Sequence, residues 1–197
     1  MTSERISGDH GEQRSQLEIN DAKPIRALGH PARITALQHL FNSGAATATE
    51  LGEIVGLSAS AMSYHLRQLE SAGLIEQAPS RGDGRERVWQ SPYSGLNLNT
   101  DAESDPEARQ ASVQFLEAFL LAQEMRARRF LTVAQHDAAL LDQGNFFESR
   151  LMMTAAEATE LGQKMQDLIS PYRLKERTDA PEDATAHSVI FRTFPLV

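Results

Sequence analysis

Apolar residues recur at helical spacing in three consecutive segments of the chain. The segments cover residues 31–41, 47–56 and 58–72. The second opens with the capping-box pattern Thr47-Ala-Thr-Glu50, whose polar side chains can satisfy free backbone N–H groups at a helix start. Glycines mark the ends of the last two segments, as is common at helix C-termini. Two short helices joined by a glycine-containing turn predict a helix-turn-helix.

The third segment has the composition of a DNA-recognition helix. Met62, Leu66 and Leu69 form its apolar face. The opposite face is small and polar and carries a single cation, so it can enter a major groove about 12 Å wide without a steric penalty. We expect DNA contacts from the start and the polar side of this helix, through Ser58, Ser60, Ala61, Ser63, Tyr64 and Arg67.

Two β-forming segments, residues 74–78 and 86–90, follow the recognition helix. The glycine-containing turn between them permits a hairpin, which predicts a wing beside the helix-turn-helix. Arg81 and Arg85 fall near its tip and Arg87 on its second strand. We expect these arginines to reach an adjacent minor groove or the phosphate backbone. The alternative is an ordinary solvent-exposed hairpin with alternating charges.

Three motifs in this region, taken in order, resemble those of the ArsR-type winged-helix repressors. They are the segments 27–33 (ALGHPAR), 57–66 (LSASAMSYHL) and 70–75 (ESAGLI). The resemblance extends over about residues 22–91 and implies a winged helix-turn-helix that binds DNA. Tyr64 stands where the family more often carries a histidine, so the resemblance does not define the preferred DNA sequence.

The resemblance also implies a metal sensor, but the chain lacks the ligands. Members of the family place thiolates on the helix that here includes residues 50–54, whereas this chain contains no cysteine. Soft-metal sensing and thiol redox switching by that route are therefore excluded. The histidines are scattered, and the pair to check is His136-Asp137, whose simpler interpretation is a solvated turn of a helix. We predict no metal and no cofactor.

The segment after the wing predicts one long helix. Ser104-Asp-Pro-Glu107 is another capping-box pattern, and no glycine or proline interrupts the chain from there to Leu141. A helix of about 36 residues would span roughly 54 Å, and its apolar stripe needs a partner. That partner is a second copy of the chain or, alternatively, the C-terminal segment of the same chain. A homodimer would hold two recognition helices about 34 Å apart, which suits an inverted-repeat operator.

Beyond Gly144 the pattern predicts a strand over residues 146–153, a helix opened by the capping box Thr154-Ala-Ala-Glu157, and a second strand over residues 188–194. These elements would form a small sheet on the long helix. An effector pocket between sheet and helix would be lined by Phe146, Phe147, Met152, Met153, Tyr172 and Phe191. The alternative is an ordinary core, which aromatic and methionine side chains more often form.

The predicted fold class is mainly α with small β: a winged helix-turn-helix, a long dimerisation helix and a small α+β C-terminal unit. We expect a disordered tail over residues 1–20, where apolar spacing is almost absent. The DNA-binding domain is predicted over residues 21–95. A domain for dimerisation and possible effector binding is predicted over residues 102–197.

The net charge of −8 is unusual for a protein that binds nucleic acid, but its distribution permits DNA binding. Residues 21–91 hold seven Lys/Arg and seven Asp/Glu, so the excess acid lies on either side of the predicted reader. A dimer would double the small cationic footprint. No apolar run is long enough to span a membrane, and we expect a soluble, cytoplasmic protein.

The sequence offers no catalytic motif, so we do not expect an enzyme. Ser63 and His65 lie two residues apart on one helix and cannot form a nucleophile and base pair. The predicted function is a homodimeric transcription regulator, a repressor on an inverted-repeat operator, which a small-molecule effector could release. The alternative is a winged-helix module that binds another regulator or polymerase. Steep salt dependence of DNA binding would favour the regulator.

Overall fold

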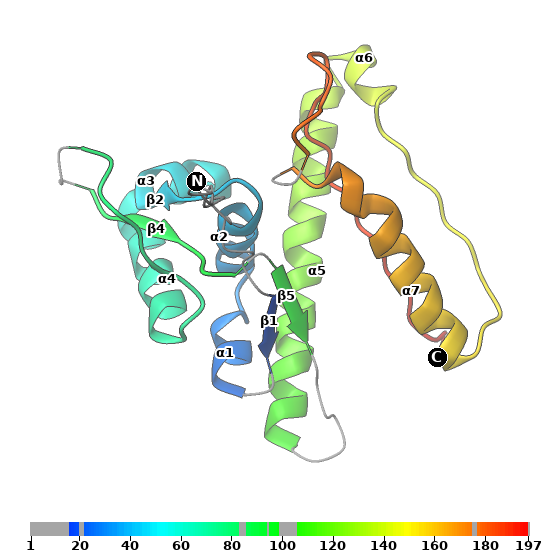
Figure 1. Cartoon of the computed structure of the whole chain (residues 1–197), viewed down its shortest axis with the longest axis horizontal. Helices are drawn as coiled ribbons and strands as arrows, with labels where there is room; N and C mark the ends of the chain where they lie inside the picture. Colours follow the sequence, from blue (N-terminus) through cyan, green and yellow to red (C-terminus); the bar gives the residue numbers. More distant parts are fainter. Residues whose placement is uncertain are drawn as a thin grey trace, which may run out of the picture. The chain divides into compact units, whose positions relative to one another are not determined.

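The computed structural model describes residues 16–19, 22–82, 86–93, 95–98, 106–174 and 177–196. The chain divides into two compact units, unit 1 (Met1–Ala127) and unit 2 (Arg128–Val197). Figure 1 labels most of the helices and strands of both units.

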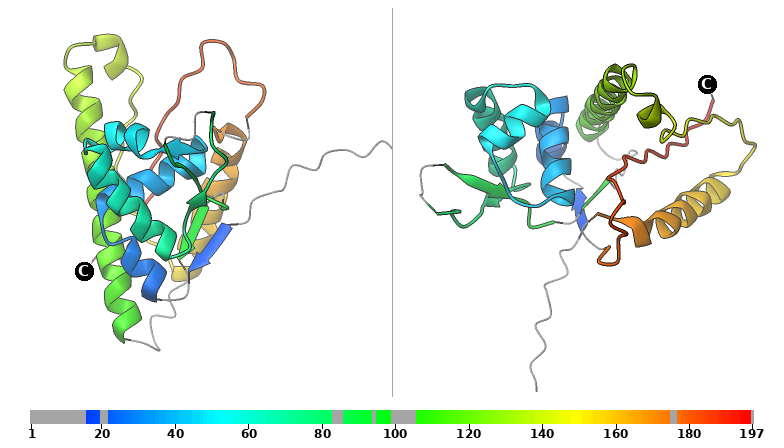
Figure 2. Two further views of the ribbon diagram at one scale, coloured as in Figure 1. Left: turned by 90° about the vertical axis from the view of Figure 1, so that its left-hand side faces the viewer. Right: turned by 90° about the horizontal axis from the view of Figure 1, so that it is seen from above.

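In the described part of unit 1, four helices precede the wing. They are α1 (Ala22–Ala27), α2 (Pro31–Asn42), α3 (Ala48–Val55) and α4 (Ala59–Ser71). The last three confirm the helices predicted from apolar spacing. α2, α3 and α4 contact one another and lie side by side in both views of Figure 2. α3 and α4 are the two helices of the helix-turn-helix.

Side-chain caps define where α3 and α4 begin. The predicted capping box is formed, because the Thr47 hydroxyl accepts the backbone N–H of Glu50 and the Glu50 carboxylate accepts that of Thr47. The Ser58 hydroxyl accepts the N–H of Ala61. Between the helices the chain turns at Gly56, whose φ of 79° lies in the left-handed region that glycine adopts without strain. Caps and turn together orient α4.

A three-stranded antiparallel sheet forms the wing. β4 (Val88–Gln90) is central, with β2 (Ala46–Thr47) on one side and β3 (Glu76–Gln77) on the other. The two predicted hairpin strands are present but shorter than expected, and the sequence did not predict β2. Trp89 is buried and lies opposite residues of both neighbouring strands. The sheet therefore ties the wing to the start of α3.

The core of unit 1 joins the helix-turn-helix to the first part of α5 (Pro106–Ala134). Its buried members include Leu37, Leu40, Leu51, Met62, Leu66, Leu69, Ala111, Phe115, Ala118 and Ala122. Arg126 of α5 also donates a hydrogen bond to Gln38 of α2 at 2.8 Å. Unit 1 thus extends well beyond residue 95, the predicted end of the DNA-binding domain.

One strand lies within the predicted tail. β1 (Gln16–Ile19) pairs in parallel with β5 (Gly95–Leu98). The prediction of a disordered tail is therefore wrong for these four residues, and the rest of the tail lies outside the described residues. Because the pairing joins segments that are far apart in the sequence, the local pattern did not reveal it.

The long helix predicted to extend to Leu141 is present but is interrupted near its end. α5 ends at Ala134 and a short helix, α6 (Ala138–Leu141), follows. Asp137 separates them, since its backbone is extended and its carboxylate accepts the N–H groups of Ala139 and Leu140. A short polar side chain that bonds to nearby N–H groups favours a helix start over a helix interior.

The rest of unit 2 is helical where predicted but has no sheet in its described residues. α7 (Ala155–Ile169) begins at the predicted capping box, and a 3₁₀ turn (Ser170–Tyr172) follows it. The strands predicted over residues 146–153 and 188–194 are wrong, as neither segment pairs with another strand. Among the described residues of unit 2 only Ala134 is buried, so no apolar layer is present on which a sheet could pack.

None of the helices in the described ranges combines the length and apolar character needed to cross a membrane.

Candidate nucleic-acid interface

The outward face of α4 carries side chains that were predicted to meet DNA. Ser60, Tyr64 and Arg67 are exposed, Tyr64 over 54% of its surface. Ser63 is half-buried, and its hydroxyl donates to the carbonyl oxygen of Ala59 at 2.8 Å. The three apolar residues of the opposite face are fully buried. α4 therefore presents a polar surface on a firmly packed helix.

Two further predicted contact residues lie at the start of α4. Ser58 is exposed and is the N-cap, and Ala61 is half-buried. Free N–H groups and the helix dipole favour an anion at a helix N-terminus. Both residues therefore help to shape and orient the predicted contact surface.

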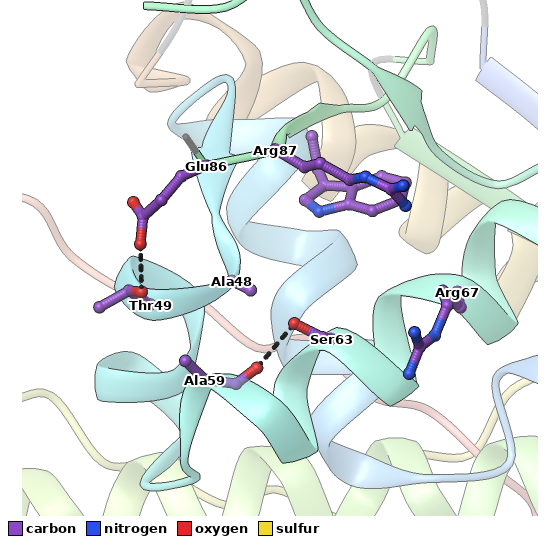
Figure 3. Close-up of a pocket in the computed structure, with 8 residues that line it drawn as sticks. Ala48, Thr49, Ala59, Ser63, Arg67, Glu86 and Arg87 are labelled. Carbon is purple, nitrogen blue, oxygen red and sulfur yellow. Dashed lines mark hydrogen bonds between the residues drawn. The ribbon is translucent and has the colours of Figure 1, made fainter. Parts of the chain in front are cut away.

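A hollow of about 350 Å³ continues this surface toward the wing. Its lining comes from the start of α3, from α4, and from β4 with the residues just before it. Figure 3 shows the lining residues, which are Ala48, Thr49, Ala59, Ser63, Arg67, Glu86, Arg87 and Trp89. The hollow thus brings together three predicted contact residues, Ser63, Arg67 and Arg87, from two parts of the sequence.

The two arginines of the hollow are unpaired within the part of the chain that the structure describes. Arg67 and Arg87 are exposed, and within the described ranges neither side chain has a hydrogen-bond or ion-pair partner. The carboxylate of Glu86 is engaged elsewhere, because its Oε1 accepts a hydrogen bond from Thr49 Oγ1 at 2.8 Å. Figure 3 shows Glu86 directed toward Thr49 and the Arg87 side chain running the other way. Both cations are therefore available to an external anion.

Arg81 occupies a different environment from the one expected at a wing tip. Its Nη1 donates to Glu50 Oε1 at 2.9 Å, and its Nη2 donates to the carbonyl oxygen of Ala45. The backbone N–H of Thr47 and the nearby Arg81 charge hold the pKa of Glu50 below its usual value. Arg81 thus braces the wing against the first turn of α3. Arg85 lies outside the described residues.

A histidine pair supports α4 from within unit 1. The rings of His30 and His65 stack with centroids 4.5 Å apart, and Tyr64 meets the His65 ring edge-on at 5.5 Å. His30 Nδ1 accepts the N–H of Ala32 as the N-cap of α2, while His65 Nδ1 is buried and finds no partner among the described residues. Burial lowers the pKa of both histidines; the charge of Arg33 lowers that of His30 further, and His30 and Arg33 lower that of His65 further. Both rings are therefore neutral near pH 7.

Five of the six residues predicted to line an effector pocket are exposed in unit 2. Phe146, Phe147, Met152, Tyr172 and Phe191 are exposed, Phe147 by 87% and Met152 by 101%, and Met153 is half-buried. The sheet that was expected to hold them is not formed.

No three His, Asp or Glu side chains gather as metal ligands in the part of the chain that the structure describes. The one pair singled out in the sequence has local partners. His136 Nε2 lies 3.0 Å from the Gln135 amide nitrogen, and Asp137 caps α6.

Sequence reasoning missed the side of the hollow formed by Thr49, Glu86 and Trp89. The capping box correctly predicted that Thr49 lies in the first turn of α3, and Glu86 fell in the second predicted strand of the hairpin, next to Arg87. Thr49 and Glu86 are 37 residues apart in the sequence, however, and only the folded sheet brings them together. No local signal therefore identified this pair.

Comparison with known families gives an independent view of this segment. Residues 30–86 match the MarR family. The matched range contains α2, the helix-turn-helix and β3 but ends before β4, and it supports the predicted winged-helix fold. The match favours MarR, a related winged-helix family, and does not support the ArsR-type assignment. The match covers 57 of the 197 residues, so it describes this segment and not the whole chain.

Individual proteins resemble the chain over different lengths. The HTH-type transcriptional regulator YgaV of Escherichia coli (strain K12) is 44% identical over 52 residues, which are 26% of this chain and 52% of YgaV. The match thus spans about half the length of that curated relative. A structure of Lactococcus lactis ZitR (C30AH42A mutant) covers 83% of this chain and 82% of its own, with 13% identity and a TM-score of 0.25. With a TM-score this low, the ZitR structure does not inform the fold of this chain.

Proposed function

We propose that this protein is a sequence-specific DNA-binding transcription regulator whose α4 lies in the major groove. The observation that carries the proposal is the continuous polar surface of α4 and the adjoining hollow, which holds two guanidinium groups that have no partner among the described residues. The MarR family match and the likeness to YgaV support the same function. A regulator of this kind would act in the cytoplasm.

Each side chain of this surface has a role that follows from its chemistry. Ser60, Ser63 and Tyr64 would contact base edges through hydroxyl groups, which donate or accept hydrogen bonds. Arg67 would bind a phosphate or a guanine, and Arg87 would bind the backbone. Arg81 has no direct role in this proposal, because its guanidinium is bound to unit 1 itself.

We further propose that two copies bind an inverted repeat, acting as a repressor. The support is the exposed side of α5 within unit 1. Val113, Leu116 and Leu120 are exposed at i, i+3 and i+7 spacing, while Phe115 and Ala122 on the other side are buried. An apolar helical stripe in water favours association with a matching surface, and two-fold pairing uses the same stripe on both copies. No effector is included, since the residues predicted to bind one are exposed in unit 2.

The experiment that tests DNA reading is selection from random double-stranded DNA with the full-length protein. The enriched site is then titrated at several salt concentrations. We expect an inverted repeat with half-sites about one helical turn apart and an affinity that falls steeply with salt. Absence of enrichment together with flat salt dependence would reject the proposal and favour the alternative, a module that binds a protein partner.

The dimer is tested separately by sedimentation of a Leu116→Glu, Leu120→Glu double variant. Charges on a buried apolar interface are costly, so we expect monomers and loss of binding to the full inverted repeat. Gln114→Glu is the matched control, because it adds negative charge at an exposed polar position of the same helix. A double variant that sediments like the wild-type protein would remove α5 from the proposed interface.

A further inference from the structure

Glu86 is the one acidic side chain among the eight described residues that line the hollow. It shares this hollow with Arg67 and Arg87, yet its carboxylate forms no ion pair with either. The hydrogen bond from Thr49 Oγ1 to Glu86 Oε1, 2.8 Å long, holds the carboxylate at the α3 side instead. The hollow therefore has a cationic wall and an anionic wall.

These two walls have opposite consequences for a DNA duplex. The guanidinium groups attract any phosphate and do not distinguish one sequence from another. The carboxylate repels phosphate, and it has only acceptor oxygens. When DNA displaces the water around it, the carboxylate needs a new hydrogen-bond donor, since a desolvated charge without a partner is unfavourable.

The major groove offers donors at some bases only. Cytosine presents its N4 amino group and adenine its N6 amino group, whereas guanine and thymine present acceptors there. A carboxylate fixed beside the groove therefore favours a base pair whose amino group faces it. It also disfavours any placement that brings a phosphate to the same position.

We propose that Glu86, positioned by Thr49, is a specificity-determining residue that accepts a hydrogen bond from a base amino group in the major groove. The inference rests on the proposed function, because it assumes that the hollow faces DNA. Glu86 weakens binding to most sequences and so sharpens the choice of operator. Thr49 is a positioning residue that keeps the carboxylate away from the two arginines.

The test compares the full-length wild-type protein with Glu86→Gln in two assays, site selection and titration against both the selected operator and random-sequence DNA. Gln has nearly the same shape and can still accept from Thr49, but it has no charge. We expect tighter binding to random DNA and a drop of about tenfold per half-site in the ratio of operator to random affinity, as is typical of one specific base contact. The preference for cytosine or adenine at one position of each half-site should also weaken, and the selected base identifies which amino group is read.

Glu53→Gln is the matched control, since Glu53 is an exposed acid of α3 that does not line the hollow. It removes the same charge and should change both affinities by the same factor. A second variant, Thr49→Val, keeps the Glu86 carboxylate but removes the hydrogen bond that positions it. We expect it to lose part of the base preference while the protein melts at nearly the same temperature.

The outcomes separate the inference from the function on which it rests. If the wild-type protein selects an operator and Glu86→Gln keeps both the affinity ratio and the base preference, the role of Glu86 is refuted and the regulator stands. If Glu53→Gln lowers the ratio as much as Glu86→Gln, a general charge effect replaces the specific contact. If the wild-type protein selects no site, the proposed function and this inference both fail.

Discussion

Replacing Arg67 with alanine is a direct probe of the proposed interface. The Arg67 side chain is exposed on α4 and has no partner among the described residues, so its removal breaks no interaction that supports unit 1. Surface substitutions of this kind usually change stability by less than about 0.5 kcal/mol. A change in DNA binding would therefore report the contact itself and not a loss of folding.

The expected magnitude follows from the number of phosphates involved. Each phosphate neutralised on double-stranded DNA contributes about 0.9 to the slope of log affinity against log salt. A dimer contains two copies of Arg67, so Arg67→Ala should lower the slope by about 1.8. Between roughly 50 and 200 mM salt, this corresponds to about a twelvefold smaller loss of affinity. If Arg67 instead binds guanine, the slope changes little and operator binding weakens by about 1–3 kcal/mol per half-site.

The assay is fluorescence anisotropy of labelled operator DNA with full-length protein at four salt concentrations. Arg87→Ala, which removes the second free cation of the hollow, should lower the slope in the same way. Arg150→Ala is the matched control, because it removes one exposed positive charge from unit 2. The docking is refuted if Arg67→Ala changes neither the slope nor operator affinity, or if Arg150→Ala has an equal effect.

Two further predictions concern stability. Gly52→Ala should destabilise the protein by about 1–3 kcal/mol in urea unfolding, since a Cβ there would lie 2.7 Å from the Leu57 carbonyl oxygen and would force α3 and the turn apart. In contrast, Gly162→Ala in α7 should stabilise its helix by up to about 1 kcal/mol, because nothing lies within 4 Å of the added Cβ. Equal effects of the two variants would contradict the close approach of Gly52 to the Leu57 carbonyl oxygen. Acidification should also destabilise unit 1. Folding lowers the pKa of His30 and His65 below the ordinary 6.5. Their contribution to the free energy of unfolding is therefore complete above about pH 6.5 and declines as the pH falls through the lowered values. The free energy of unfolding measured from pH 8 to 5 should show this decline, and His65→Gln should reduce its slope; an unchanged slope would exclude the ring as its source.

Local signals predicted most of the helix-turn-helix. Thr47, Glu50 and Gly56 define the ends of α3 through contacts within a few residues, and the predicted capping box is present. The spacing of Met62, Leu66 and Leu69 correctly predicted the buried side of α4. Local reasoning also predicted α7 in unit 2 but failed for the two strands expected there, because an apolar pattern forms a sheet only where a second layer buries it.

The sequence by itself determined where the helices of the winged helix-turn-helix begin and end and which face of α4 is polar. Caps, turn glycines and apolar spacing act over a few residues, so they can be recognised from the sequence without knowledge of the fold. Only the tertiary structure decided which polar groups meet. It paired Arg81 with Glu50, drew Glu86 toward Thr49, and left Arg67 and Arg87 in one hollow without a partner among the described residues. These pairings depend on the sheet that joins β4 to the start of α3. Side chains far apart in the sequence form hydrogen bonds only when the backbone brings them within hydrogen-bonding distance.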